Sequence, residues 1–112
     1  MSDDATTTST TSGPMAVYAR IPAQPGRRDE LVAALQQAIE NANDEDGTRL
    51  YILHTNDADP DAAFFYELYT DEAALIAHGT SDKFKALGAS LRDIAGGRPE
   101  ITRLTPVGGK GL

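Results

Sequence analysis

The sequence AFFYELY, residues 63–69, is apolar or aromatic on both sides of the β-strand that it predicts. Glu67 shares its side of the strand with two aromatic residues, Phe65 and Tyr69. The opposite side holds three further apolar or aromatic residues, Phe64, Tyr66 and Leu68. An antiparallel strand with one side in water alternates apolar with polar residues instead. We therefore predict that both faces of the sheet containing this strand are covered.

Three more strands are predicted around this one. Residues 15–22 (MAVYARIP) alternate between two sides in the manner of a strand. Residues 48–55 (TRLYILHT) are rich in strand-forming side chains, and the turn sequence NDADPD at residues 56–61 connects them to residues 63–69. These two strands are predicted to form a hairpin. Residues 99–107 (PEITRLTPV) predict the last strand.

One helix is predicted between the first two strands. It follows the chain-breaking pair Pro25-Gly26 and is expected to end near Asn43, before the turn-rich residues 44–47 (DEDG). Its apolar residues recur with helical spacing and form one stripe: Leu31, Leu35, Ala38, Ile39 and Ala42. This stripe predicts an amphipathic helix with one face against the sheet.

A second helical region is predicted between residues 70 and 97. Residues 70–72 (TDE) are typical of a helix start, with acidic side chains in the first turn. Gly79 is expected to kink or interrupt the helix, which resumes at Ser81. The second part carries the stripe Phe84, Leu87, Leu91 and Ile94, and Gly96-Gly97 is expected to stop it.

The order strand, helix, strand, strand, helix, strand is that of an α+β ferredoxin-like fold, in which two helices cover one face of a four-stranded antiparallel sheet. The other face then needs a cover, and a homodimer that packs sheet against sheet supplies one. We expect six residues on that face: Tyr18, Tyr51, Leu53, Phe64, Tyr66 and Leu68. The alternative is that aromatic side chains are simply tolerated at the edge of the sheet.

One domain accounts for most of the chain, because 112 residues build a single hydrophobic core. We place this domain at residues 15–107. Residues 1–14 (MSDDATTTSTTSGP) are rich in Thr and Ser and have little apolar surface to bury, so we expect a disordered tail. Residues 108–112 (GGKGL) are expected to be a short flexible tail. The N-terminal tract also lacks the regions of a signal peptide, so we expect a cytoplasmic protein.

Composition excludes several classes of partner. The net charge of −7, from 17 acidic and 10 basic side chains, argues against nucleic acid, whose phosphates bind clustered Lys and Arg. The chain has no cysteine, which excludes disulfides, thiolate metal sites and a cysteine nucleophile. Its apolar runs are shorter than the about 20 residues that a membrane span requires. We therefore expect neither nucleic acid nor a membrane as a partner.

No metal site is predicted. The two histidines, His54 and His78, lack the close ligand spacing of a zinc or non-haem iron site. Asp57, Asp59 and Asp61 alternate in the hairpin turn, which is a pattern of calcium ligands. The segment nevertheless lacks the Gly and the distal Glu of an EF-hand loop, so a solvated turn is the better interpretation.

The chain resembles the antibiotic biosynthesis monooxygenase family over nearly all of residues 15–107. The order and spacing of several short motifs carry the resemblance: Pro25-Gly26, Gly47, Tyr51, the strand FYELY at residues 65–69, Ala74-Leu75 with His78, Ser81 and Phe84, and Leu104-Thr105-Pro106-Val107. It implies a dimeric α+β barrel, with a small-molecule pocket between the helices and the sheet of each subunit.

Family members include cofactor-independent oxygenases of quinols and polycyclic phenols, haem-degrading enzymes and an isomerase of a phosphorylated sugar. The haem-degrading members carry Asn, Trp and His at positions that correspond to about Ala19, His78 and Gly88 here, so no haem is expected. The resemblance thus implies a monooxygenase that oxidises a small quinol-like or polyketide-like aromatic with O2 and no cofactor. A non-catalytic metabolite-binding protein and an isomerase are the alternatives.

His78 and Glu67 are the expected catalytic residues. A neutral imidazole on the apolar stripe of the second helix can remove a phenolic or quinol proton, which creates an anion able to pass an electron to oxygen. The alternative for His78 is a structural side chain bonded to a backbone carbonyl. Glu67 either orients His78 or contacts the substrate, or it forms a structural pair with Arg20, Arg49 or Arg103.

Five residues are expected to bind the substrate: Leu35, Phe65, Tyr66, Tyr69 and Phe84. The two tyrosine hydroxyls are candidates to donate hydrogen bonds to an oxygenated ring, and a place in the hydrophobic core is the alternative for both. The other three side chains are expected to set the size of the pocket.

Overall fold

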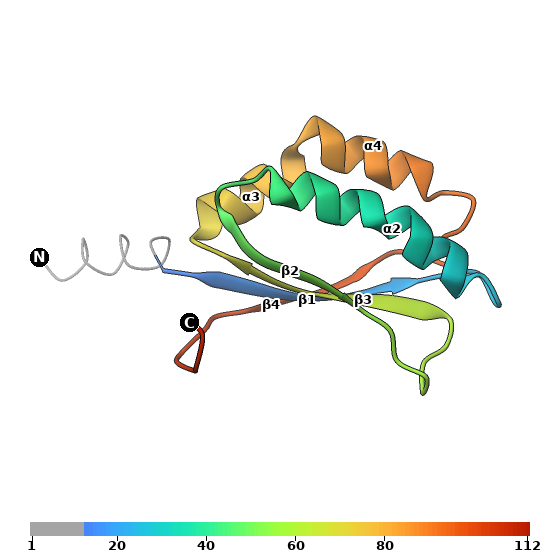
Figure 1. The fold of residues 1–112 in the computed structure, drawn as a ribbon, viewed down its shortest axis with the longest axis horizontal. Helices are drawn as coiled ribbons and strands as arrows, with labels where there is room; N and C mark the ends of the chain where they lie inside the picture. The colour runs from blue at the N-terminus through green and yellow to red at the C-terminus, as the bar shows by residue number, and fades with distance from the viewer. Residues whose placement is uncertain (1–12) are drawn as a thin grey trace, which may run out of the picture.

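The computed structural model describes residues 13–112, and in them a four-stranded antiparallel sheet carries three helices on one face (Figure 1). The strands are β1 (Met15–Pro22), β2 (Thr48–His54), β3 (Ala62–Tyr69) and β4 (Glu100–Leu104). They lie in the order β2-β3-β1-β4, so the first and third strands of the chain form the centre. This is the predicted α+β ferredoxin-like fold. The predicted disordered tail, apart from Gly13 and Pro14, lies outside the described residues.

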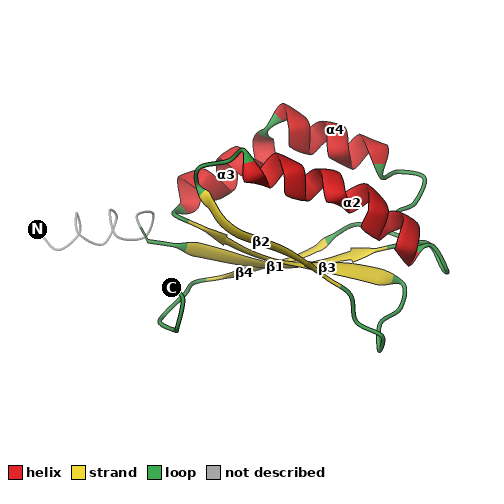
Figure 2. Ribbon diagram, viewed as in Figure 1, coloured by secondary structure: helices red, strands yellow, loops and turns green. Residues whose placement is uncertain are grey.

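The three helices are α2 (Arg28–Asn43), α3 (Glu72–Thr80) and α4 (Asp82–Ser90), and Figure 2 shows all of them on the same side of the sheet. The long helix α2 begins just after residues 25–26 and ends at Asn43, as the sequence predicts. Its stripe residues Leu31, Leu35 and Ala38 are buried against the sheet. Within residues 13–112, no helix is long and apolar enough to cross a membrane.

The second helical region differs from the prediction in where it breaks and ends. Helix α3 runs through Gly79, and the break comes at Ser81, whose backbone is extended. The Ser81 hydroxyl accepts a hydrogen bond from the backbone N–H of Phe84 at 3.1 Å and so caps α4. Helix α4 then ends at Ser90, before the Gly96-Gly97 stop that was predicted. Residues 91–94 form turns, and Ala95 then pairs with Ala23 beside the sheet.

Gly96 is required at this crossing. A Cβ at position 96 would collide with the backbone carbonyl of Ala23. The Gly96 N–H meanwhile donates a hydrogen bond to the carbonyl of Pro22 at 2.9 Å. The close approach of two backbones thus brings the chain from α4 to the start of β4.

Strand register determines which side chains face the helices. Val17 of β1 lies opposite Glu67 of β3 on one side and opposite Arg103 of β4 on the other, and Glu67 lies opposite Tyr51 of β2. Directly opposed residues share a face of the sheet. One row of Tyr51, Glu67, Val17 and Arg103 therefore crosses the sheet beneath the helices.

The expectation that Tyr51 and Leu53 lie on the open face of the sheet is wrong. Both pack against the core beneath the helices, because β2 pairs with β3 so that Leu53 lies opposite Phe65. Leu50 and Ile52 occupy the open face instead, together with Tyr18 and Tyr66. A register irregularity between Thr48 and Leu50 disturbs the simple alternation at the start of β2.

The last strand is also shorter than predicted, ending at Leu104 and not at Val107. Leu104 pairs with Ala16, so β1 has a single strand residue left beyond this pair. Pro106 has no N–H with which to continue the ladder. Both constraints end the pairing soon after Leu104.

The buried stripe of α2 supplies much of the core. Leu31 is 0% exposed, so we expect Leu31→Ala to lower the free energy of unfolding by about 3 kcal/mol through lost burial and a residual cavity. Ile76→Ala is the control, because Ile76 is 51% exposed on α3, and there we expect a change of less than about 1 kcal/mol. Urea unfolding at one fixed protein concentration measures both, and equal losses would contradict this view of the core.

Candidate active site

A cavity of about 300 Å³ lies between the sheet and the helices. Its walls are mostly apolar and include Leu35 of α2, Phe65 of β3 and Phe84 of α4, three of the residues expected to bind the substrate. Four polar or ionisable side chains also reach it: Tyr51, Glu67, His78 and Arg103. An apolar cavity with a few convergent polar groups is the usual form of a small-molecule site.

His78 reaches this cavity from α3 and is only 7% exposed. Three aromatic rings surround its imidazole, with centroids 5.1 Å away for Tyr51, 5.4 Å for Tyr69 and 5.2 Å for Phe84. The ring lies one residue before Gly79 and close to the break between α3 and α4. Packing on several sides holds the ring in one orientation.

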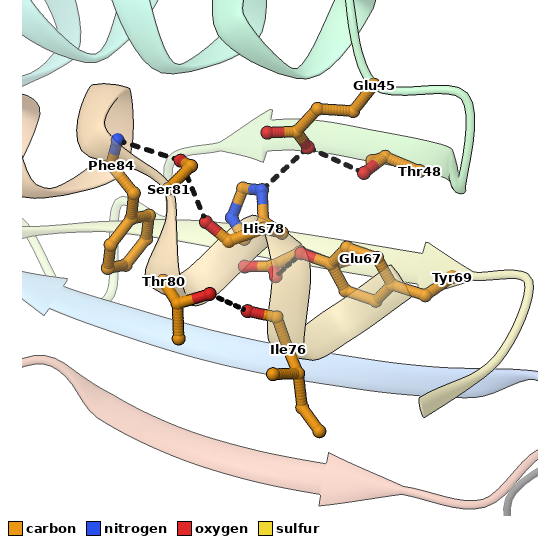
Figure 3. Close-up of polar contacts among 9 residues, drawn as sticks. All are labelled: Glu45, Thr48, Glu67, Tyr69, Ile76, His78, Thr80, Ser81 and Phe84. Atoms are coloured by element: carbon orange, nitrogen blue, oxygen red, sulfur yellow. Dashed lines mark hydrogen bonds and ion pairs between the residues drawn. The ribbon is translucent and has the colours of Figure 1, made fainter. Parts of the chain in front are cut away.

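The partner of His78 is Glu45, in the loop between α2 and β2. Figure 3 shows Nδ1 of His78 pointing at this carboxylate, and the distance from Nδ1 to Oε1 of Glu45 is 2.8 Å. The same oxygen accepts a hydrogen bond from the hydroxyl of Thr48 at 2.7 Å. An ionised carboxylate only accepts hydrogen bonds, so the proton of the neutral ring is on Nδ1. The lone pair of His78 is therefore on Nε2.

The Nε2 atom lies on the side of the ring turned away from Glu45 (Figure 3). Among residues 13–112 no side chain or backbone group hydrogen-bonds it, and it is not one of the fully enclosed polar atoms. A carboxylate behind one nitrogen and a free lone pair on the other is the arrangement of a histidine general base. Glu45 orients the ring and is placed to stabilise an imidazolium, were Nε2 to take a proton.

Glu67 is buried at 6% exposure in the middle of β3 and accepts a hydrogen bond from the hydroxyl of Tyr69 at 2.5 Å. Burial raises the pKa of the Glu67 carboxyl, and the negative charge of Glu45 adds to the rise. The Tyr69 hydrogen bond and the charge of His78 oppose it. Burial likewise raises the pKa of both Tyr51 and Tyr69, which stay protonated. Glu67 thus favours its proton more than an exposed carboxyl does.

Sequence and structure comparisons identify the family. The model of the antibiotic biosynthesis monooxygenase family matches residues 14–89, which include both catalytic candidates. The chain belongs to this family. None of the curated proteins matches the sequence.

Solved structures agree with the assignment to the antibiotic biosynthesis monooxygenase family. A proposed antibiotic biosynthesis monooxygenase from Caulobacter crescentus CB15 is 28% identical, with a TM-score of 0.80 over 93% of this chain and 99% of that one. Rv0793 from Mycobacterium tuberculosis is 27% identical, with a TM-score of 0.78 over 88% of this chain and 100% of that one. The NE2512 protein of unknown function from Nitrosomonas europaea is 26% identical, with a TM-score of 0.77 over 90% and 94%. These likenesses support the fold more than any one reaction.

Haem does not fit this member of the antibiotic biosynthesis monooxygenase family. Ala19, His78 and Gly88, the positions that correspond to the haem-site residues of other members, all line the cavity. Gly88 has no side chain that could ligate iron, and Glu45 holds Nδ1 of His78. No group of three or more potential metal ligands occurs within the described residues 13–112.

Two of the expected binding residues lie outside the cavity wall. Tyr66 is on the open face of the sheet, opposite Tyr18 and Ile52, so the structure does not bring it together with His78. Successive strand residues point to opposite faces, and Tyr66 follows Phe65, which faces the cavity. Tyr69 is fully buried next to His78 and donates a hydrogen bond to Glu67. It therefore contacts two residues of the site without lining the cavity itself.

The two alternatives for Glu67 also need correction. It forms no ion pair with Arg20, Arg49 or Arg103. Arg20 is on the open face, where it binds Asp59 at 2.6 Å and Glu100 at 2.7 Å, and Arg103 is nearest to Glu72. Nor does Glu67 hold Nδ1 of His78, because Glu45 does. No pattern in the sequence singles out Glu45, because it lies in a run of acidic turn residues without periodicity. Only the folded chain brings this loop to α3.

The raised pKa of Glu67 predicts a pH-dependent stability. The ordinary pKa of the carboxyl is 4.5, and in the folded state it is higher. As the pH rises above 4.5, the unfolded chain therefore loses this proton more readily than the folded chain, and the free energy of unfolding falls. We expect the stability of Glu67→Gln relative to wild type to increase in the range above about pH 4.5. Urea unfolding across this range measures the difference.

Tyr69→Phe is the companion variant, because it removes the donor that favours the ionised carboxylate. Its stability is expected to fall more steeply with pH than that of wild type over the same range. A stability difference between Glu67→Gln and wild type that does not change with pH would show that the Glu67 pKa is not raised.

Proposed function

We propose that this protein is a cofactor-independent monooxygenase that oxidises a small quinol-like or polyketide-like aromatic with O2. The observation that carries the proposal is the His78–Glu45 pair at the wall of an apolar cavity. A buried imidazole with a carboxylate on Nδ1 is built to take a proton at Nε2. Membership of the antibiotic biosynthesis monooxygenase family supports the choice of oxygen as the oxidant.

The first step is removal of a phenolic or enolic proton by Nε2 of His78. The resulting anion is electron-rich and passes an electron to O2, and recombination of the two radicals forms a C–O bond. For an anthrone-like substrate, a CH2 group becomes C=O, one oxygen atom enters the product, and the other leaves as water with the two hydrogens. Glu45 stabilises the imidazolium, and the Glu67 carboxyl, whose pKa is raised by burial, lies at the cavity wall.

We expect His78→Ala to lower the rate of oxygen uptake by at least about 100-fold, the usual contribution of a general base. Glu45→Gln is expected to lose at least about tenfold, because an amide can donate to Nδ1 and stabilise the wrong tautomer. The measurement is oxygen consumption with an anthrone and a naphthalene diol, corrected for autoxidation. His54→Ala is the matched control, since His54 lies on the open face of the sheet and is expected to retain the wild-type rate.

Other outcomes distinguish the competing functions. Equal rates for wild type and His78→Ala would refute the role of His78 as base. Binding of the aromatic compounds without turnover would instead indicate a metabolite-binding protein. Turnover without oxygen consumption would indicate an isomerase.

We also propose that the protein forms a homodimer through the open face of the sheet. Four large apolar side chains on this face are well exposed: Tyr18 at 46%, Leu50 at 40%, Ile52 at 45% and Leu104 at 44%. Apolar residues gathered on one face of a small soluble domain are typical of a protein interface. Packing two such sheets together gives the dimeric α+β barrel.

A charge on that face is expected to dissociate the dimer. Ile52→Lys should give a monomer at micromolar concentration, because an ammonium ion would be buried without a partner. Ile76→Lys is the matched control, since Ile76 is similarly exposed but on α3. Sedimentation velocity measures both masses, and a wild-type monomer would refute the interface.

A further inference from the structure

We propose that the cavity selects aromatic molecules bearing a carboxylate, and that Arg103 binds this group. The proposal rests on the proposed function for where the aromatic rings lie. Arg103 belongs to β4, the strand that lies beyond the family match at residues 14–89. It lines the cavity but has no part in the proton transfer assigned to His78.

The register of the sheet places Arg103 across the cavity from the buried polar groups. Arg103 lies opposite Val17, and Val17 lies opposite Glu67 on its other side. Two strand spacings, about 10 Å in all, separate the backbones of Arg103 and Glu67. All three face the helices, so a flat ring system above Val17 would have Glu67 and His78 near one end and Arg103 near the other.

The two ends of the cavity differ in charge and in exposure to water. The side chain of Arg103 is 54% exposed, whereas Glu67 and His78 are buried. Among residues 13–112, Arg103 is the only lysine or arginine that lines the cavity. The net charge of −7 repels anions from the surface in general, so a single cation at the rim is the point at which an anion is attracted.

The current partner of Arg103 leaves its guanidinium available. Nη1 of Arg103 is 3.6 Å from Oε2 of Glu72, which is beyond hydrogen-bonding distance. Glu72 is itself 33% exposed, and such exposed pairs contribute little. Within the described residues Arg103 donates no side-chain hydrogen bond, whereas Arg20 and Arg27 each donate several. A ligand carboxylate can therefore accept two parallel hydrogen bonds from the guanidinium fork.

The experiment compares two fluorescent probes with the same ring system, anthracene-9-carboxylate and anthracene-9-methanol. Fluorescence titration under argon gives the Kd of each for the full chain. Wild type is expected to bind the carboxylate at least about tenfold more tightly than the alcohol. Arg103→Gln is expected to weaken binding of the carboxylate by about tenfold or more and to change binding of the alcohol by less than about twofold.

Four further variants complete the test. Arg103→Lys should restore part of the preference, and Arg49→Gln, an equal change of charge on β2 at the opposite edge of the sheet, should leave it intact. Leu87→Trp fills the cavity and should weaken binding of both probes. The proposal is overturned if Arg103→Gln and Arg49→Gln have the same effect, or if Leu87→Trp has none. His78→Ala should keep the wild-type preference for the carboxylate over the alcohol. Because binding under argon needs no turnover, this result does not depend on whether the proposed oxidation occurs.

Discussion

The pairing of β1 with β3 is the constraint on which the rest of the structure depends. Eight residues of each strand are paired, from Met15 with Tyr69 to Pro22 with Ala62. A slip of one residue would move every side chain of a strand to the other face. Phe65 and Glu67 would then leave the cavity, and Phe64 and Tyr66 would enter it. The apolar stripe of α2 packs only against the observed arrangement, so the core and the site are specified together.

The two carboxyl groups near His78 accept hydrogen bonds from residues of the same chain. Glu45 accepts from both His78 and Thr48, and Glu67 accepts from Tyr69. A buried carboxyl without a donor would be costly, so these bonds reduce the penalty of placing acids beside an apolar cavity. Glu45 and Glu67 have different effects on the site. Glu45 fixes the tautomer of His78, whereas burial raises the pKa of the Glu67 carboxyl.

The cavity exists because the three helices cover the sheet unequally. Helix α2 buries five residues, while α4 has no buried residue and Phe84, which it contributes to the cavity wall, is 40% exposed. Tight packing beneath α2 stabilises the domain, and the looser cover of α4 leaves space for a ligand. Elements with few buried contacts are also those that open most readily.

The sequence by itself determined the order of the elements, the helix starts at Asp71 and Ser81, the two-sided apolar character of β3 and the inward direction of His78. Each of these depends on local periodicity or on side chains that bond their own backbone. Only the tertiary structure decided that Glu45 is the partner of His78, that Tyr51 faces the helices and that Tyr66 does not face the cavity. Those features depend on the register between strands and on a loop folding back against a distant helix, and neither leaves a local pattern in the sequence.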